Sequence, residues 1–237
     1  EPRIGNGVIR GLYTKGNAIV DSYKYTLAMF QAAEKWGAKL RSGTVRGIDL
    51  ANGRVTGVTL GEETISCGQV VLAMGPWARQ AESWLDAYIP VDPLKGEFLR
   101  LDLPGPPLAH YISGAGVSVH PKTDGLVWSG TTEEWRGFDN EITESSRKFI
   151  LQGAVKLVPD LAQAALVLQT ACLRPVTPDW LPIIGRAPGW DNVYLATGGS
   201  RKGVLLSTGM GKAVSDLMTL GETQLDMNPF SPGRFAQ

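Results

Sequence analysis

A glycine-rich turn between an apolar run and a helical stretch contains the residues best suited to chemistry. The apolar run covers residues 193–197, the turn is Gly198-Gly199-Ser200-Arg201-Lys202-Gly203, and a helix is expected from about Val204 to residue 220. This order directs unpaired backbone N–H groups and the positive end of a helix dipole at one place above the strand. A bound group that becomes anionic during a reaction suits that place.

Two polar motifs precede this turn. The first is Leu173-Arg174-Pro175, directly after Cys172, and the second is Thr177-Pro178-Asp179. An arginine can hold a substrate carboxylate through two parallel charge-assisted hydrogen bonds, which makes Arg174 the first candidate for substrate binding. The alternative is a structural arginine that ties two domains together, because ion pairs of both kinds look alike in a sequence.

The motifs LRPVTPD, IIGRAP and GGSRKGV, in this order, resemble the C-terminal half of the D-amino-acid oxidase family of FAD-dependent oxidoreductases. That family includes glycine oxidase, sarcosine oxidases and amino-acid dehydrogenases. VVLAMGPWA, residues 70–78, resembles the family's strand under the adenosine half of FAD, and PLKGEFLRL, residues 93–101, is similar to its first substrate-domain strand. The resemblance implies an FAD enzyme that oxidises the carbon–nitrogen bond of a small amino acid or N-methyl amino acid by hydride transfer.

The sequence lacks the G-x-G-x-x-G fingerprint that seats a pyrophosphate between a strand and a helix. The chain starts in the middle of the family's pattern, so we expect a fragment without the first βαβ unit. The face left by that unit predicts self-association or a partner subunit. A second interpretation is a non-catalytic remnant, or a subunit of a multi-subunit dehydrogenase, that does not bind FAD on its own.

The fold class expected is α/β combined with α+β. Residues 21–90 and 176–226 are expected to form an incomplete FAD-binding Rossmann-type domain with a β-meander. Residues 1–20 and 91–175 are expected to form an antiparallel-sheet substrate domain, and residues 227–237 a surface tail.

Local signals predict the individual elements. Asp21 or Ser22 can cap a helix that ends at Gly37 and packs one face on a sheet. Strands are expected at residues 44–50, 55–60 and 64–67, with Asn52-Gly53 forming a type I′ hairpin turn. An apolar strand at 70–74, buried on both faces as in a parallel sheet, and a helix at 143–157 complete the pattern.

The resemblance assigns cofactor roles to several residues. Backbone groups of Gly198, Gly199, Ser200, Gly203 and Val204 are expected to approach the flavin. Arg201 and Lys202 are expected near its N1 and C2 carbonyl, where cations would raise the reduction potential. The alternative for these two side chains is a solvated basic turn.

The adenosine side of FAD is expected to lie on a second group of residues. Gly75, Pro76 and Trp77 match the family's A-G-x-W motif, although an ordinary strand-to-loop turn is the alternative. Val45 stands where the family contacts adenine through its backbone.

Cys172 has two interpretations. Its spacing from Thr177-Pro178-Asp179 matches sarcosine oxidase relatives in which the cysteine bonds covalently to flavin. The other interpretation is a small apolar residue beside a non-covalent cofactor. Where relatives place a tyrosine that donates to the substrate carboxylate, this chain has Ser118 and His120, so the substrate stays open.

Composition excludes several other functions. The 23 Lys and Arg residues balance the 23 Asp and Glu residues, so the chain has no excess of positive charge that would favour binding of nucleic acid. The apolar runs are shorter than the roughly 20 residues of a membrane span. Two cysteines and two histidines that do not cluster make a metal site improbable, and so few cysteines favour a reducing, cytoplasmic location.

Overall fold

The computed structural model describes residues 1–235 as two compact units. The first unit comprises residues 1–38 and 95–173, and the second comprises residues 39–94 and the chain from residue 174 onward. Both units mix helices with sheets that contain antiparallel strands, as the sequence predicts. Among residues 1–235, no helix combines the length and the hydropathy needed to cross a membrane.

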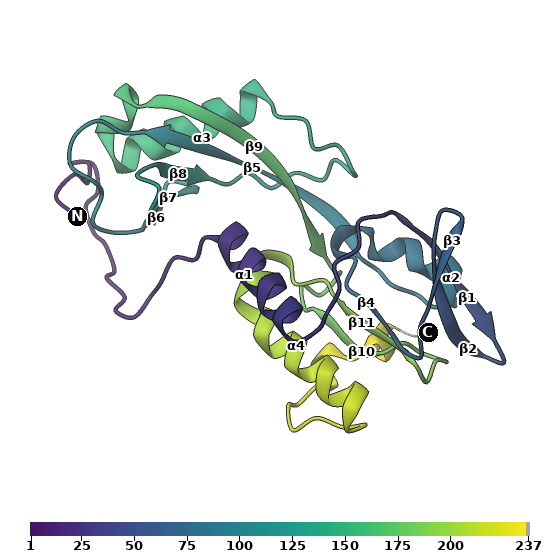
Figure 1. Cartoon of the computed structure of the whole chain (residues 1–237). Helices are drawn as coiled ribbons and strands as arrows, with labels where there is room; N and C mark the ends of the chain where they lie inside the picture. Colours follow the sequence, from purple (N-terminus) through teal and green to yellow (C-terminus); the bar gives the residue numbers. More distant parts are fainter. Residues whose placement is uncertain (236–237) are drawn as a thin grey trace. The chain divides into compact units, whose positions relative to one another are not determined.

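A five-stranded sheet, in the order β6-β7-β8-β5-β9, forms the centre of the first unit. The pairs β6–β7, β7–β8 and β8–β5 are antiparallel. Helix α3 lies along one face of this sheet (Figure 1). The bounds of these elements are β5 (Asp92–Asp102), β6 (Ile112–Gly114), β7 (Val117–Pro121), β8 (Val127–Gly130), α3 (Glu144–Leu157) and β9 (Ala165–Val176).

Alternation along β7 decides which side chains enter the core of the first unit. Val117 and Val119 are buried with Ile150 and other apolar residues of α3, whereas Ser118 points to the opposite face. Gly153 of α3 lets the helix approach closely, because a Cβ there would meet Val117 Cγ2 at 2.8 Å. The predicted start of α3 is confirmed by Thr143, whose side chain accepts a hydrogen bond from the Ser146 backbone N–H.

A buried charge pair anchors α3 and β9 to β5. Lys95 and Glu97 are fully buried, with 3.5 Å between Nζ and Oε1. Burial by itself would raise the pKa of Glu97, but hydrogen bonds from Thr143, Gln169 and Ser146 hold it below the ordinary value. The charges are therefore satisfied inside the unit rather than left to solvent.

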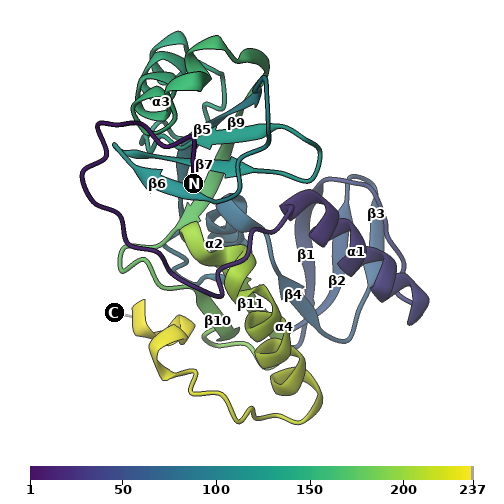
Figure 2. The ribbon, with the colours of Figure 1, turned by 90° about the vertical axis from the view of Figure 1, so that its left-hand side faces the viewer.

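The second unit is built on the sheet β10-β11-β4, with α4 on one face (Figure 2). Tyr194 and Ile184 pack against Ala213 of α4, while Leu72 and Leu195 join a core cluster on the other side with the short helix α2. The parallel pairing of β4 with β11 is as predicted, but the predicted burial of β4 holds only for Leu72, because Val70 and Val71 are partly exposed. The bounds are β4 (Val70–Leu72), α2 (Glu82–Leu85), β10 (Ile183–Arg186), β11 (Val193–Thr197) and α4 (Gly203–Thr219).

The predicted meander precedes β4 as β1 (Val45–Ala51), β2 (Arg54–Leu60) and β3 (Glu63–Ser66). These strands are antiparallel in the order β1-β2-β3. Asn52 has φ 52° and Gly53 has φ 73°, as a type I′ turn requires. Buried Asn192 ties the meander to the rest of the unit, because its amide donates to the carbonyls of Val55 and Gly68 at 2.7 and 2.9 Å.

Helix α1 (Ser22–Lys35) has the predicted ends but not the predicted packing. Asp21 accepts a hydrogen bond from the Lys24 backbone N–H at 3.1 Å, and Gly37 has φ 92° just beyond the helix. None of its residues is buried, and Tyr23 and Phe30 are among the exposed large apolar side chains. Its apolar spacing is typical of a helix face that packs on a sheet, but this spacing alone does not supply the surface that would cover it.

The expected surface tail is wrong for the residues up to 235. Short 3-10 helices cover Asn228–Phe230 and Pro232–Phe235, Pro232 is buried, and Phe235 packs on the core cluster that contains Leu72. The rest of the expected tail, residues 236–237, lies outside the described residues. The segment is held by contacts with residues far away in sequence, which proline and glycine content does not reveal.

Three further 3-10 helices are Gly75–Ala81, Pro159–Gln163 and Ser200–Lys202.

Candidate functional site

Two glycine turns lie together at one edge of the β10-β11-β4 sheet. Because β4 and β11 are parallel, with Val70 opposite Val193, both strands end at the same edge. Gly75 lies beyond β4 and Gly198 follows β11 directly, and the Thr197 hydroxyl donates to the Gly75 carbonyl at 3.0 Å. Ligands of open α/β sheets bind at the carboxyl ends of parallel strands, so this edge is the candidate site of the second unit.

Packing explains why the first two residues of the second turn are glycines. Gly198 has φ 74°, and a Cβ on it would meet Thr177 Cγ2 at 2.8 Å. A Cβ on Gly199 would meet the Gly203 Cα at 2.6 Å. These contacts bring the T-P-D motif, the turn and the start of α4 into one compact corner.

Gly203 differs from the two glycines before it. Its φ is −54°, ordinary for a helix, and apart from its chain neighbours and the nearby backbone of α4, no atom lies within 4 Å of the position where its Cβ would stand. Neither backbone conformation nor packing within the chain therefore requires glycine here. The absence of a side chain opens space at the first residue of α4, where a bound group could approach the backbone.

The N-terminus of α4 has no side-chain cap. Lys202 is the N-cap residue and makes no capping hydrogen bond through its side chain. Ser200 Oγ is buried and has no hydrogen-bond partner within residues 1–235. An uncapped helix start beside an unsatisfied hydroxyl is suited to an electron-rich acceptor group from a ligand.

The two basic residues of the turn are both exposed. The Arg201 guanidinium carbon lies 4.9 Å from the centroid of the Trp180 ring, an arrangement that favours a cation–π interaction. Arg201 thus has a defined direction, and Trp180 is a residue that sequence reasoning did not single out. Its φ of 62°, unusual for tryptophan, gives no signal in the sequence.

Asp179 organises the loop that supports the glycine turn. It accepts hydrogen bonds from the Leu181 backbone N–H at 3.1 Å and from Arg234 Nε at 2.8 Å. The Arg234 hydrogen bonds are the main reason why the pKa of Asp179 is below its usual value, with Leu181 and Thr177 adding to the effect against burial. Arg234 lies in the segment expected to be a tail, and no sequence signal links it to Asp179.

The remaining sequence candidates have the following places. Arg174 is half-buried near the end of β9, and Cys172 is exposed on the same strand, with its Sγ 3.6 Å from the Gly96 carbonyl oxygen. Trp77 is exposed and Pro76 is buried in the 3-10 helix that begins at Gly75. Val45 begins β1 opposite Leu60, in the other sheet of the second unit.

Ser118 and His120 come together on β7 in the first unit. Ser118 Oγ lies 2.7 Å from His120 Nε2. Burial, and secondarily the nearby Lys122, lowers the pKa of His120 to about 4, so the ring is neutral at physiological pH. Within residues 1–235, no group of three or more His, Cys, Asp or Glu side chains is arranged to hold a metal ion.

Comparison with known proteins gives one consistent family. The family model described as FAD dependent oxidoreductase, or DAO, matches residues 1–217. Glycine oxidase from Pseudomonas aeruginosa is 30% identical over 233 residues, which are 98% of this chain and 64% of that protein. The chain thus spans less than two thirds of the length of this relative.

Solved structures agree with the sequence relatives. Glycine oxidase from Geobacillus kaustophilus superimposes with a TM-score of 0.83 at 30% identity, over 89% of this chain and 57% of that chain. L-proline dehydrogenase from P. horikoshii gives a TM-score of 0.82 at 25% identity, over 91% and 60%. With a family model that matches most of its length, the chain belongs to the DAO family of FAD-dependent oxidoreductases.

Proposed function

We propose that this chain is the part of an FAD-dependent oxidoreductase that oxidises the carbon–nitrogen bond of a small amino acid or N-methyl amino acid. The observation that carries the proposal is the corner of Gly198, Gly199 and Gly203, where an uncapped helix start follows a parallel strand in a chain of this family. The relatives named glycine oxidase and L-proline dehydrogenase support an amino-acid substrate.

The residues of this corner fit a flavin. The open space at Gly203 and the unpartnered hydroxyl of Ser200 match a planar ring with acceptor atoms. Backbone groups from Gly198 to Val204 would hold the ring, and Gly75, Pro76, Trp77 and Val45 would lie on the adenosine side. When bound, FAD supplies the acceptor for the hydride removed from the substrate carbon.

The side chains of the chain bind and orient rather than transfer protons. Arg174 would hold the substrate carboxylate with its planar fork of donors, which fixes the reacting carbon in place. Arg201 and Lys202 would place positive charge beside the corner, where it stabilises negative charge that develops during the reaction. Cys172 is a candidate for covalent attachment, since its thiol is exposed.

The partner proposal rests on exposed apolar residues. Within residues 1–235, no residue of α1 is buried, and Leu205 in the first turn of α4 is 78% exposed. Large apolar side chains at such exposure favour association with a partner subunit or a second copy of the chain. A monodisperse monomer by light scattering would argue against this part of the proposal.

We propose a cytoplasmic location, because Cys67 and Cys172 are both free thiols.

The test is the visible absorption spectrum of the purified chain with FAD, followed by gel filtration. Flavin bands that travel with the protein support the proposal, and bands that survive acid precipitation and washing in the wild type but not in Cys172→Ala identify a covalent bond. A colourless protein supports the alternative, a chain that does not bind FAD on its own.

A pair of glycine variants separates a binding site from a structural turn. Gly203→Leu puts a side chain into the open space and should abolish FAD binding without lowering the unfolding temperature. Gly209→Leu, also in α4 with nothing within 4 Å, is the matched control and should bind FAD like the wild type. Equal binding by both variants would refute the assignment of the flavin to this corner.

A further inference from the structure

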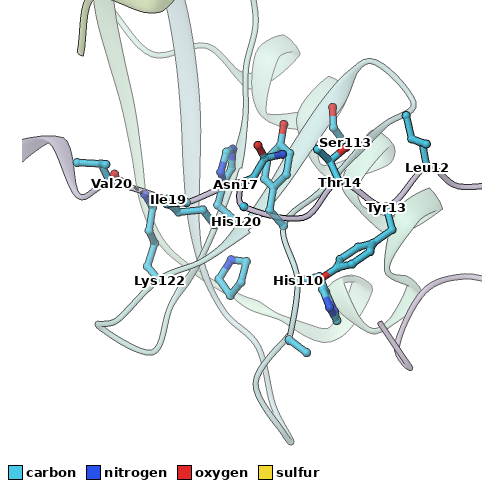
Figure 3. Close-up of a pocket in the computed structure, with 15 residues that line it drawn as sticks. Leu12, Tyr13, Thr14, Asn17, Ile19, Val20, His110, Ser113, His120 and Lys122 are labelled. Atoms are coloured by element: carbon cyan, nitrogen blue, oxygen red, sulfur yellow. Dashed lines mark hydrogen bonds between the residues drawn. The ribbon is translucent and has the colours of Figure 1, made fainter. Parts of the chain in front are cut away.

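Basic side chains lie over tryptophan rings in both units. In the first unit, Lys122 lines a pocket of about 820 Å³ (Figure 3), and its ammonium lies 5.0 Å from the centroid of the Trp128 ring. Its Nζ also donates to the Val20 carbonyl at 3.1 Å, and this hydrogen bond accounts for its position. In the second unit, the Arg201 guanidinium carbon lies 4.9 Å from the centroid of the Trp180 ring. This second pair lies beside the glycine corner, and its backbone is strained.

Trp180 has a backbone conformation that a bulky residue rarely adopts, with φ 62°. Within residues 1–235, the other non-glycine residues with positive φ are Asn52, Asp86, Ala115 and Ser200. Asn52 and Ala115 lie in hairpin turns and Asp86 ends helix α2, and these positions account for their positive φ. Trp180 and Ser200 remain, and both are neighbours of Arg201: Ser200 precedes it in the chain, and Trp180 provides the ring beneath it.

Hydrogen bonds on both sides of Trp180 fix this conformation. The Trp180 backbone N–H donates to the Thr177 carbonyl at 3.1 Å, and Thr177 Oγ1 lies 2.7 Å from the Leu181 carbonyl oxygen. The Leu181 backbone N–H donates to Asp179 at 3.1 Å. Strained backbone persists only where the surrounding structure over-determines it, and it is concentrated at functional sites. The loop thus gives the Trp180 ring a fixed direction, toward Arg201.

Arg201 and Lys202 place two positive charges at the end of α4 where a cation is least favourable. They directly precede the N-terminus of α4, which is the positive end of the helix dipole. The Trp180 ring offsets part of this cost, because the face of an indole attracts a cation. A negative charge bound at the helix start would offset the rest. The arrangement therefore favours a bound group that carries negative charge in at least one of its states.

We propose that Trp180 is a positioning residue, which orients Arg201 and thereby sets how strongly the corner prefers the reduced, anionic form of the flavin. The inference rests on the proposed function, because it takes the flavin to lie in the glycine corner. Reduction of the flavin by two electrons with uptake of one proton leaves a negative charge on its ring, which a guanidinium stabilises. An arginine that is already oriented loses less side-chain freedom when it meets this charge. Trp180 acts through Arg201.

The reduction potential of FAD bound to the 237-residue chain tests the proposal. An exposed cation–π interaction makes the stacked position of Arg201 about two- to fivefold more populated. Trp180→Ala should lower the preference for reduced over oxidised FAD by about the same factor, which at 29.6 mV per tenfold change is a potential lower by about 10–20 mV. Trp180→Phe keeps a ring and should restore part of this loss. Trp135→Ala, which removes an exposed tryptophan of the first unit, is the matched control and should leave the potential unchanged.

A double-mutant cycle shows whether Trp180 acts through Arg201. Arg201→Met should lower the potential at least as much as Trp180→Ala, and adding Trp180→Ala to Arg201→Met should change nothing further. Equal potentials in the wild type and Trp180→Ala, or effects that add fully in the double variant, would overturn the proposal.

A second measurement needs no FAD. In ¹H–¹⁵N NMR spectra of the chain without FAD, the Arg201 Nε–H signal should be shifted upfield, because the face of an indole ring shields a proton above it. The signal is assigned by its loss in Arg201→Met. Trp180→Ala should move it to the position of a solvated arginine, and Trp135→Ala should leave it in place. An Arg201 signal that is unchanged in Trp180→Ala would overturn the proposal.

A glycine variant separates positioning from general stabilisation. Glycine adopts φ 62° without strain, so Trp180→Gly should unfold at a higher urea concentration than Trp180→Ala. Its reduction potential should nevertheless be as low as that of Trp180→Ala, because both lack the ring. A potential that rises with stability across these two variants would indicate a merely structural role and refute the inference.

These outcomes distinguish the inference from the proposed function. Absence of FAD binding by the wild type would overturn the proposed function, and the redox role of Trp180 with it. FAD binding with a potential that does not depend on Trp180 would overturn the inference alone.

Discussion

Gly198→Ala gives the sharpest test of the corner that supports the proposed flavin site. Two costs add at this position. Alanine at φ 74° is strained by about 1–2 kcal/mol relative to glycine. Its Cβ would also stand 2.8 Å from Thr177 Cγ2 and 3.3 Å from the Ile183 backbone nitrogen, an overpacking that costs about 1–3 kcal/mol.

The free energy of unfolding should therefore fall by about 2–5 kcal/mol, a large share of the stability of an ordinary domain. Urea unfolding followed by circular dichroism measures this change. Gly211→Ala is the control, because this glycine lies in α4 with nothing within 4 Å, and alanine there should raise stability by about 0.5–1 kcal/mol.

A second substitution separates the two costs. Thr177→Ser removes Cγ2 but keeps the hydroxyl, which lies 2.7 Å from the Leu181 carbonyl oxygen. Combined with Gly198→Ala, it should recover the part due to the clash and leave the part due to backbone strain. Wild-type stability in Gly198→Ala, or no coupling between the two substitutions, would refute the reasoning.

Three further predictions concern other groups. Asn192→Ala should lower the free energy of unfolding by about 2–4 kcal/mol in urea, because it leaves the backbone N–H and carbonyl of Val55 buried without their partner. Arg234→Met should lower the unfolding temperature at pH 7. Arg234 holds the pKa of Asp179 below its ordinary 3.8. The difference in unfolding temperature between the wild type and Arg234→Met should therefore shrink as the pH falls below 3.8 and Asp179 becomes protonated. A difference that stays constant with pH would contradict the pairing. The His120 ring should titrate near pH 4 in NMR spectra, because burial lowers its pKa from the ordinary 6.5. The neutral buried ring should therefore contribute to stability above about pH 6.5, and this contribution should decline as the pH falls through 4. A titration midpoint of the ring near pH 6.5 would contradict its burial.

Local chemistry predicted the element ends well. Asn52-Gly53 formed the predicted hairpin because both positions require positive φ, which asparagine and glycine tolerate. Asp21 and Thr143 capped their helices because a side-chain oxygen satisfies a backbone N–H three residues ahead. These interactions span a few residues, so the sequence contains all their parts.

The candidate site was only partly predictable. The glycines after β11 mark a turn in the sequence, but a motif does not tell which glycine is required by packing and which leaves open space. That distinction between Gly198 and Gly203 depends on Thr177 and on the start of α4. The burial of Ser200 Oγ likewise results from packing of the whole corner.

The sequence by itself determined the strand-turn-helix order, the antiparallel sheet of residues 91–173 and the family. Tertiary structure alone decided that Arg234 binds Asp179, 55 positions earlier, and that residues between 12 and 20 line the same pocket as His120. It also left α1 without a buried face. The physical reason is the sequence separation between interacting residues. The backbone groups of caps and turns find their hydrogen-bond partners among neighbours in the chain, whereas ion pairs and pockets depend on which distant segments the packed core brings together.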